Sequence, residues 1–393
     1  MPLRITLLTG EYPPQPGGVG DYTRRLGKAL VVRGHTVSVL TMYVGRMVAY
    51  DVATDLPLPL LPQPTHQRNP WGWAAWSAIT GALDLLRPDW LHVQYQTGAY
   101  NMHPAINLLP WRLRRMAKRP LIAVTFHDLL VPYLFPKAGR LRTYVNQQLA
   151  RDADVCIVTN GDDRAQFAAF NPTVIPIGSN IAVAPPPGYA PTSWRAALGI
   201  DPLTPLIAYF GLLSPTKGVD TLLDALANWP TQPTPVLLLI GGAATAPHDQ
   251  AYATSIHATI ERLQPRFRTI VTGHVDEAAV SAHLLAADVV ALPFRDGVSF
   301  RRGSLLAALH HGCPIVTTFP TATMAAEGIA LIDQTHARCV PPDDPTALAA
   351  ALADLLQDSA ARLRLGSAAR QLATHFSWES IAERHEAIYM RCT

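Results

Sequence analysis

A glycine run near the N-terminus has the composition of an anion-binding loop. Gly17-Gly18-Val19-Gly20 directly precedes a stretch that we predict to be helical from Asp21. Glycine lets the backbone approach a ligand closely, and the first turn of a helix offers unpaired N–H groups to an anion. The same glycines also fit an ordinary turn, and their spacing differs from the dinucleotide-binding motif G-x-G-x-x-G.

A histidine and a lysine follow two other apolar segments. His127 comes directly after Leu121–Thr125 and Phe126, where it could donate a hydrogen bond or shuttle a proton near neutral pH. With 14 histidines in the chain, a structural role is the common alternative. Lys217 lies in the segment from Gly211 through Ser214 to Gly218, just before a predicted helix, which suits it to hold phosphate. An exposed loop lysine would have the same neighbours.

The segment 293–304 is the strongest predicted phosphate site. Arg301 and Arg302 precede Ser304, which we predict to be the N-cap of the apolar helix that follows. Two guanidinium groups and the first amides of that helix would converge on one anion. The same segment contains Asp296, Ser299 and Gly303. Two other predicted strand ends carry further candidates, namely Gly241 and Gly242 at one and Gly273, His274 and Val275 at the other.

These segments are positioned by a repeated strand and helix pattern. Short apolar runs typical of buried strands begin near residues 4, 37, 90, 121, 155 and 174, and again near 206, 236, 269, 289 and 314. Helical stretches separate most of them, which predicts an α/β protein with parallel sheets. The proline-rich segment 179–191 has no periodicity. We therefore predict two doubly wound domains with a cleft between them, and ligands at the carboxyl ends of the strands.

Composition excludes several classes of protein. The 393 residues are 49% hydrophobic and 16% charged, too apolar for a disordered chain. Apolar runs are too short for a membrane span or a leader peptide. Four scattered cysteines argue against a disulfide framework and a cysteine zinc site. We predict a cytoplasmic protein with reduced thiols.

Charge is distributed unevenly along the chain. Residues 1–178 carry a balance of +7 and the remainder −4, which favours anionic partners for the first half. Within it, Trp111–Arg119 combines apolar side chains with five cations. This segment predicts either a surface that contacts anionic lipid at the inner face of the membrane or an amphipathic helix packed on its own sheet. No nucleic-acid-binding module is recognised.

Several motifs in order resemble the retaining glycosyltransferases of family 4, which have the GT-B fold. They are Glu11-Tyr-Pro-Pro with the following Gly-Gly-Val-Gly-Asp-Tyr, Ser-Pro-Thr-Lys-Gly at 214–218, Ala287–Pro293, Gly-Cys-Pro-Ile-Val at 312–316, and the final segment from Phe376 to Tyr389. The resemblance implies an N-terminal acceptor-side Rossmann-like domain at 1–180 and a C-terminal nucleotide-sugar-binding domain at 192–375. It also implies a last helix, about 376–393, that crosses back to the N-terminal domain.

The resemblance assigns roles by position. Gly18 and its neighbours would approach the donor diphosphate, His127 would lie near the sugar, and Lys217 would neutralise the leaving group. The stretch Gly273–Val275 would receive the base. No metal and no cofactor are implied, the donor being a UDP-, GDP- or similar nucleotide sugar. The complete predicted site comprises the catalytic residues His127, Lys217, Arg301 and Arg302, and the donor-binding residues Gly17, Gly18, Val19, Gly20, Gly211, Ser214, Gly241, Gly273, His274, Val275, Asp296, Ser299, Gly303 and Ser304.

The sequence departs from the family pattern at three positions. Leu212 stands where the family usually has arginine, and Ser299 and Ala307 stand where it has two glutamates. Arg301 or Arg302 could replace the missing cation, and Asp296 the missing sugar contact. We predict transfer of a sugar to an acceptor hydroxyl of a glycan, a lipid or a small molecule, with retention of configuration. The alternatives are a catalytically silent nucleotide-sugar-binding or partner protein and, less consistent with the motifs, a GT-B epimerase or phosphorylase.

Overall fold

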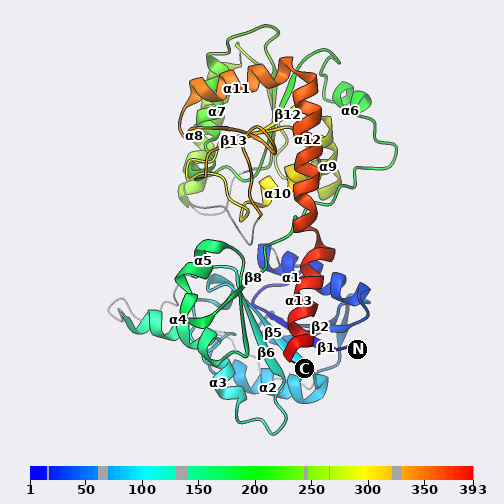
Figure 1. Cartoon of the computed structure of the whole chain (residues 1–393), viewed down its shortest axis with the longest axis vertical. Coiled ribbons are helices and arrows are strands. Elements are labelled where there is room, and N and C mark those ends of the chain that lie inside the picture. The colour runs from blue at the N-terminus through cyan, green and yellow to red at the C-terminus, as the bar shows by residue number, and fades with distance from the viewer. Residues whose placement is uncertain are drawn as a thin grey trace. The chain divides into compact units, whose positions relative to one another are not determined.

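The computed structural model describes residues 1–15, 17–60, 70–129, 140–242, 247–264, 266–320 and 329–392. The chain folds into two compact units, drawn in Figure 1. The N-terminal unit comprises Met1–Ile177 together with Trp378–Thr393, and the C-terminal unit comprises Gly178–Ser377.

The N-terminal unit is built on an eight-stranded sheet in the order β4-β3-β2-β1-β5-β6-β7-β8. Strand β3 pairs antiparallel with both β2 and β4, and all the other pairs are parallel. The strands are β1 Arg4–Thr9, β2 Thr36–Tyr43, β3 Arg46–Asp51, β4 Leu56–Leu58, β5 Trp90–Tyr95, β6 Leu121–Phe126, β7 Val155–Val158 and β8 Thr173–Val174. Its helices are α1 Gly18–Val32, α2 Ala75–Leu86, α3 Leu109–Leu113, α4 Arg140–Asp152, α5 Gly161–Gln166 and α13 Trp378–Cys392, with 3₁₀ turns η1 Gly98–Tyr100 and η2 Ala168–Phe170.

Helix α13 forms part of the core of the N-terminal unit. Its Ile381 and Tyr389 are fully buried and pack in one cluster with Leu26 of α1, Leu7 of β1 and Trp90 of β5. Figure 1 shows α13 as the red helix beside α1. The end of the chain therefore completes the hydrophobic core around the first strand.

The C-terminal unit is built on a six-stranded sheet in the order β11-β10-β9-β12-β13-β14, with every pair parallel. The strands are β9 Leu206–Phe210, β10 Val236–Ile240, β11 Thr269–Val271, β12 Val289–Leu292, β13 Ile315–Thr318 and β14 Arg338–Val340. The helices are α6 Pro191–Ala197, α7 Val219–Ala227, α8 Pro247–Leu263, α9 Glu277–Ala286, α10 Gly303–His310, α11 Pro345–Gln357 and α12 Ser359–Ala373, with 3₁₀ turns η3 Pro215–Lys217 and η4 Thr374–Phe376.

Both sheets change their direction of winding beside the first strand of the unit. In the N-terminal unit β1 pairs with β2 on one side and with β5 on the other. In the C-terminal unit β9 pairs with β10 and with β12. Connections leave on opposite faces at such a point, which opens a crevice at the carboxyl ends of the two strands. The structure confirms the predicted α/β class and parallel sheets.

The structure differs from the sequence predictions in two places. Strands β3, β4 and β14 were not predicted from the sequence. Helix α3 ends at Leu113, so an amphipathic helix over the whole of Trp111–Arg119, one of the two predicted alternatives, does not form. Arg114, the C-cap residue, makes an ion pair with Asp152 at 2.6 Å. Among the described residues, no helix is long and apolar enough to span a bilayer.

Candidate functional site

The loops after β9 and β12 lie against each other at the winding change of the C-terminal sheet. Gly218 has φ +65°, and a Cβ there would lie 2.0 Å from the carbonyl oxygen of Pro293. Gly241 has φ +123°, and a Cβ there would lie 2.4 Å from the carbonyl oxygen of Gly211. Only glycine fits at these two contacts. The predicted turn 214–218 and the predicted loop 293–304 are thereby brought together.

Two cations meet on one buried aromatic ring in this region. Lys217 Nζ lies 5.2 Å from the ring centroid of Phe294, and Arg302 Cζ lies 5.0 Å from it. Arg302 also makes an ion pair with Asp296. Burial and, to a smaller extent, the nearby Arg302 lower the pKa of Lys217 to about 8, and Asp296 partly opposes them. Two positive charges thus lie against one ring, and one of them makes an ion pair with Asp296.

Helix α10 begins beside these cations. Its N-cap is Arg302, whose side chain makes no capping hydrogen bond, so the prediction that Ser304 is the N-cap is wrong. Ser304 is the second helical residue and is buried, with its Cβ 3.9 Å from the position that a Cβ on Gly211 would take. The N-cap moves because residues 299–302 close a turn, in which Arg302 N–H donates to Ser299 O at 3.1 Å. Gly303 and Arg301 are exposed at this helix start.

The ends of β10 and β11 border the same region. Gly241 N–H donates to Gly273 O at 3.2 Å, and the N–H of Leu213 donates to Gly242 O at 3.0 Å. His274 is exposed and Val275 is half-buried. The backbone thus links the predicted residues of three strand ends, and Ser214 lies half-buried at the start of η3.

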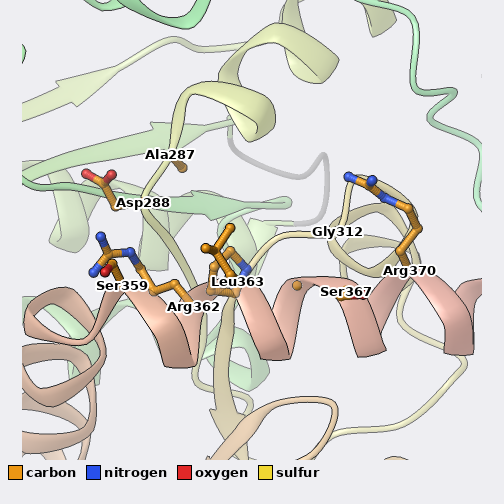
Figure 2. Close-up of a pocket in the computed structure, with 10 residues that line it drawn as sticks. Ala287, Asp288, Gly312, Ser359, Arg362, Leu363, Ser367 and Arg370 are labelled. Atoms are coloured by element: carbon orange, nitrogen blue, oxygen red, sulfur yellow. The ribbon is translucent and has the colours of Figure 1, made fainter.

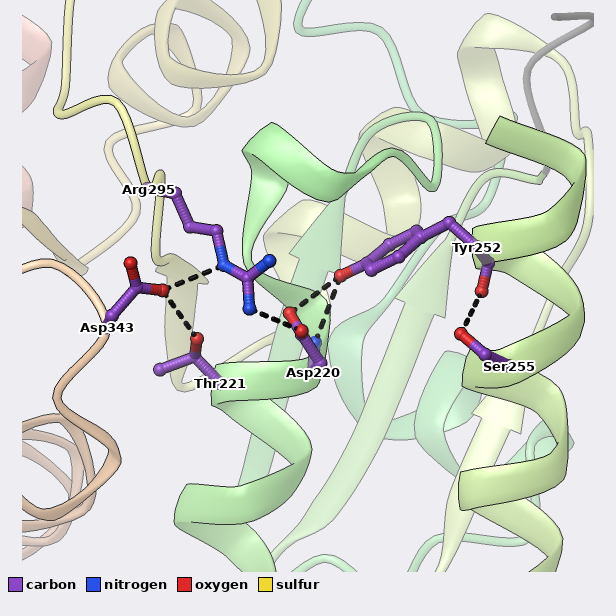
Figure 3. A network of polar contacts seen from close by, with 6 residues as sticks. All are labelled: Asp220, Thr221, Tyr252, Ser255, Arg295 and Asp343. Atoms are coloured by element: carbon purple, nitrogen blue, oxygen red, sulfur yellow. Dashed lines mark hydrogen bonds and ion pairs between the residues drawn. The ribbon is translucent and has the colours of Figure 1, made fainter. Parts of the chain in front are cut away.

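A charged network behind the cations fixes the two loops (Figure 3). Arg295 donates to Asp343 Oδ1 at 2.8 Å and to Asp220 Oδ2 at 2.5 Å. The Tyr252 hydroxyl donates to Asp220 Oδ1 at 2.8 Å. Arg295 N–H also donates to Thr216 O at 3.0 Å. One residue next to Phe294 and Asp296 therefore ties the β12–α10 loop to the start of α7 and to the loop before α11.

The glycine run of the N-terminal unit lies at the start of α1, which begins at Gly18 rather than at Asp21. Glu11 Oε1 accepts hydrogen bonds from Val19 N–H at 3.0 Å and from Gly20 N–H at 3.4 Å. A Cβ on Gly17 would lie 2.0 Å from the same oxygen. The protein's own carboxylate therefore occupies the helix start that the sequence assigned to a phosphate, and its hydrogen bonds explain why the helix begins earlier.

His127 lies at the end of β6, in a neutral environment. Its Nε2 is 2.9 Å from Gln94 Oε1, and its ring meets the ring of Tyr22 edge-on with centroids 4.7 Å apart. The ring is partly exposed, yet burial and the nearby His385 lower the pKa of His127 to about 3. The imidazole is therefore uncharged at neutral pH.

A buried polar layer continues behind His127 into α13. His92 Nδ1 lies 2.6 Å from the Tyr389 hydroxyl, and His92 Nε2 lies 2.8 Å from Thr125 Oγ1. His385 Nδ1 is 2.8 Å from Ile381 O. Burial holds the pKa of His92 well below its usual value and lowers the pKa of His385 to about 4. The layer is uncharged throughout.

Comparison with known proteins identifies the family. A model described as "Glycosyl transferase 4-like domain" matches residues 17–178, and one described as "Glycosyl transferases group 1" matches residues 204–358. The chain belongs to the group 1 glycosyltransferases of family 4. The two matches correspond to the two units of the structure.

The names of the relatives of this glycosyltransferase refer to different substrates. It is 29% identical to D-inositol 3-phosphate glycosyltransferase of Corynebacterium diphtheriae over 71% of this chain and 67% of the relative. It is 26% identical to phosphatidyl-myo-inositol mannosyltransferase of Mycobacterium leprae over 98% of this chain and 96% of the relative. Against a second inositol phosphate glycosyltransferase, of Xylanimonas cellulosilytica, the match spans about half of the relative's length, 51%.

Solved structures show the same fold. HepE of Anabaena in complex with UDP aligns with a TM-score of 0.72 at 20% identity, over 100% of both chains. Sucrose-phosphate synthase of Thermosynechococcus elongatus aligns with a TM-score of 0.72 at 22% identity, over 99% of both chains. These neighbours are GT-B glycosyltransferases, so the glycosyltransferase has the predicted GT-B fold.

Sequence reasoning missed three residues of the glycosyltransferase's site. Phe294 reads as an ordinary apolar residue after a strand, and only the structure brings two cations to its ring. Gln94 lies inside an apolar strand, where a lone amide is itself an unusual signal. Glu11 was used only as part of a motif. It lies six residues before the glycine run, close enough along the chain for its carboxylate to accept hydrogen bonds from the first amides of the helix.

A separate groove of about 520 Å³ lies at the opposite end of the C-terminal sheet. Asp288 and Pro314 directly precede β12 and β13, and α12 supplies Arg362 and Arg370 on the other wall. Figure 2 shows the two arginines on the same helix with Leu363 between them. The groove contains none of the predicted site residues. Among the described residues, no group of three or more histidine, cysteine or acidic side chains forms a metal site.

Proposed function

We propose that this glycosyltransferase transfers a sugar from a nucleoside-diphosphate sugar to an acceptor hydroxyl and binds the diphosphate on its C-terminal unit. The observation that carries the proposal is the convergence of Lys217 and Arg302 on Phe294, beside the start of α10. Two cations on one ring repel each other, and this repulsion adds to burial, the larger cause, in lowering the pKa of Lys217. A diphosphate would relieve that repulsion and accept hydrogen bonds from the first amides of the helix.

Arg302 takes the place of the family arginine in this proposal. At the family position Leu212 is 53% exposed and carries no charge. Arg302 is half-buried and its ion pair with Asp296 keeps it at the site in the free protein. Asp296 acts as a counter-ion that the diphosphate displaces, and its carboxylate is then available to a sugar hydroxyl.

The chemistry proposed needs neither a metal nor a cofactor. The cations and the amides of α10 stabilise the charge that develops on the leaving diphosphate. The leaving phosphate oxygen accepts the proton of the acceptor hydroxyl, and the new glycosidic bond forms on the face that the diphosphate leaves. The anomeric configuration is then retained.

Two comparisons support this donor and acceptor class. The structural neighbour HepE was solved with UDP and with UDP-glucose. The sequence relatives carry inositol phosphate or phosphatidylinositol acceptors in their names. We therefore propose a UDP- or GDP-type sugar as donor and a polyhydroxylated acceptor.

The proposal is tested by nucleotide binding and by turnover in Lys217→Ala. A nucleotide that binds, among UDP, GDP and ADP, should raise the melting temperature of the wild type. At 100 times its dissociation constant it stabilises the folded protein by ~2.7 kcal/mol. The variant should lose this shift and about 10²–10³-fold in transfer rate. Arg364→Ala removes an exposed cation of α12 and is the matched control. Near-normal transfer by Lys217→Ala contradicts the proposed diphosphate site.

The pH dependence of nucleotide binding follows from the same lysine. Because the pKa of Lys217 is about 8, its positive charge is lost as the pH rises above that value. Affinity for a nucleoside diphosphate should therefore fall between pH 7 and pH 9 in the wild type. In Lys217→Arg this fall should disappear, since arginine stays charged throughout the range.

A catalytically silent nucleotide-binding protein is the second candidate. It is favoured by the two positions where the family has glutamate, since Ala307 is fully buried and Ser299 is half-buried, and neither carries a charge. Tight nucleotide-sugar binding without transfer to inositol, glucose or a lipid acceptor would support it. Turnover with any acceptor excludes it.

Contact with a membrane is a separate proposal for the N-terminal unit. Trp111 is 41% exposed, and Arg115 lies over its ring at 4.4 Å. Indole and guanidinium groups together suit the interface of an anionic membrane. Co-sedimentation with phosphatidylglycerol vesicles at low salt should be lost in Trp111→Ala, and no sedimentation of the wild type contradicts the proposal.

A further inference from the structure

The amide of Gln94 is the direct hydrogen-bonding partner of His127. Gln94 lies on β5, is fully buried, and places Oε1 2.9 Å from His127 Nε2. In this orientation of the amide, Oε1 accepts the hydrogen bond, which assigns the proton to His127 Nε2. The other ring nitrogen, Nδ1, then has a lone pair and no hydrogen.

The surroundings of His127 keep the ring neutral. Tyr22 of α1 packs edge-on against it, and His92 of β5 and His385 of α13 lie in the uncharged layer behind. Asp128, the next residue, directs its carboxylate to Thr97, at 3.5 Å from the amide and 3.3 Å from the hydroxyl. No charge on these elements pairs with the imidazole among the contacts described, so the amide decides where its single proton lies.

We propose that Gln94 is a positioning residue that fixes the orientation and the tautomer of His127, with Nε2 protonated and Nδ1 bare. The inference rests on the proposed function for its consequence in catalysis. A bare Nδ1 can accept a hydrogen bond from a sugar or acceptor hydroxyl and cannot donate one to a phosphate oxygen. Gln94 thereby makes His127 selective for a hydroxyl.

The tautomer is measured directly on the wild-type protein. Ring ¹⁵N shifts of His127, assigned by comparison with His127→Gln, should show Nε2–H at pH 7 without any substrate. A dominant Nδ1–H tautomer overturns the proposal. Because this measurement needs no turnover, it remains decisive for Gln94 even if Lys217→Ala transfers normally and the proposed function fails.

Two substitutions of Gln94 test its consequence. Gln94→Glu places a negative charge beside Nε2 and should raise the pKa of His127 by about 1–3 units, moving the acidic limb of kcat/KM to higher pH by the same amount. Gln94→Leu should populate both tautomers and lower kcat about 10–100-fold, the range for a misplaced proton-handling group, with little change in nucleotide affinity.

Thr125→Val is the matched control for these variants. Thr125 lies in the same buried layer and contacts His92 but not His127. It should leave both the His127 tautomer and the acidic limb in place. An equal displacement of the limb in Thr125→Val and Gln94→Glu, or none in Gln94→Glu, overturns the positioning role. If Gln94→Leu does not fold, the positioning role of Gln94 is tested by Gln94→Glu and by the ¹⁵N spectrum of the wild type.

Discussion

The two parallel sheets present different chemistry at the carboxyl ends of their strands. In the N-terminal unit, Glu11 covers the first amides of α1, and burial keeps His127, the hydrogen-bonding partner of Gln94, neutral. In the C-terminal unit, the start of α10 has no side-chain cap, and Lys217 and Arg302 lie beside it. The proposed function therefore uses the same architecture for neutral hydroxyls in one unit and for an anion in the other.

The origin of this difference is local. Both loops contain glycines at a helix start, which by themselves favour an anion in either unit. A single carboxylate at the start of α1 opposes that preference, whereas in the other unit Asp296 makes an ion pair with Arg302, and the N-cap residue of α10 makes no side-chain capping hydrogen bond. Whether a helix N-terminus is available to an anion therefore depends on which acidic side chains can reach its first amides.

The largest expected effect is a loss of stability of the N-terminal unit at acidic pH. His92 and His385 are fully buried with pKa values below the unfolded value of about 6.5, so the unfolded chain binds more protons below that pH. Stability of the N-terminal unit should be complete above pH 6.5 and fall as the pH drops, by about 1.4 kcal/mol per pH unit for each imidazole. Urea unfolding followed by tryptophan fluorescence at pH 7, 6 and 5 measures it, since most tryptophans lie in this unit.

His385→Phe sharpens the acid experiment. The variant replaces one buried imidazole by an aromatic ring that cannot bind a proton. The loss of stability per pH unit should therefore become smaller. An unchanged dependence on pH would mean that His385 does not titrate on unfolding and that the neutral layer is not the cause.

Arg302→Ala should have the next largest effect. It removes the cation that we propose in place of the family arginine and should lower transfer about 10²-fold, with weaker nucleotide binding. Arg301→Ala, at the neighbouring exposed position, should have a smaller effect. Isothermal titration with UDP or GDP and initial rates compare the two, and equal losses would contradict the special role of Arg302.

Asp296→Asn distinguishes a counter-ion from a sugar ligand. If the carboxylate mainly competes with the diphosphate, the variant should bind free nucleoside diphosphate several-fold more tightly, because Arg302 no longer needs to leave an ion pair. A lower rate of sugar transfer by Asp296→Asn would then indicate the second proposed role of Asp296, contact with a sugar hydroxyl. Weaker binding of the free nucleotide by Asp296→Asn would show that the ion pair instead positions Arg302 for the anion.

Glu11→Gln should have the smallest effect. The amide oxygen still accepts the hydrogen bonds of Val19 and Gly20, but the negative charge at the start of α1 is lost, which costs about 0.3–1 kcal/mol. Nucleotide affinity of the C-terminal unit should not change. A large gain in nucleotide affinity would show that α1 also takes part in anion binding.

The sequence indicated most of the parallel strands because each is a short apolar run bounded by turn residues. It did not indicate β3, which alternates less regularly, or the end of α3 at Leu113, where tertiary contacts of Arg114 compete with helical periodicity. Within the site, the turn with Lys217 and the loop with Arg302 carry strong local signals. Phe294 and Gln94 carry almost none, because their roles depend on what other strands bring to them.

The amino-acid order alone determined the α/β class, the family and the segments that carry the cations, since strand length, glycine placement and charge are local properties of the chain. Tertiary structure decided which of those segments meet. The winding change beside β9 brings Lys217 and Arg302 to one ring, and the β1–α1 loop folds so that Glu11 reaches the first amides of α1. Distances between side chains on different strands depend on sheet order and loop closure, which no local pattern in the sequence encodes.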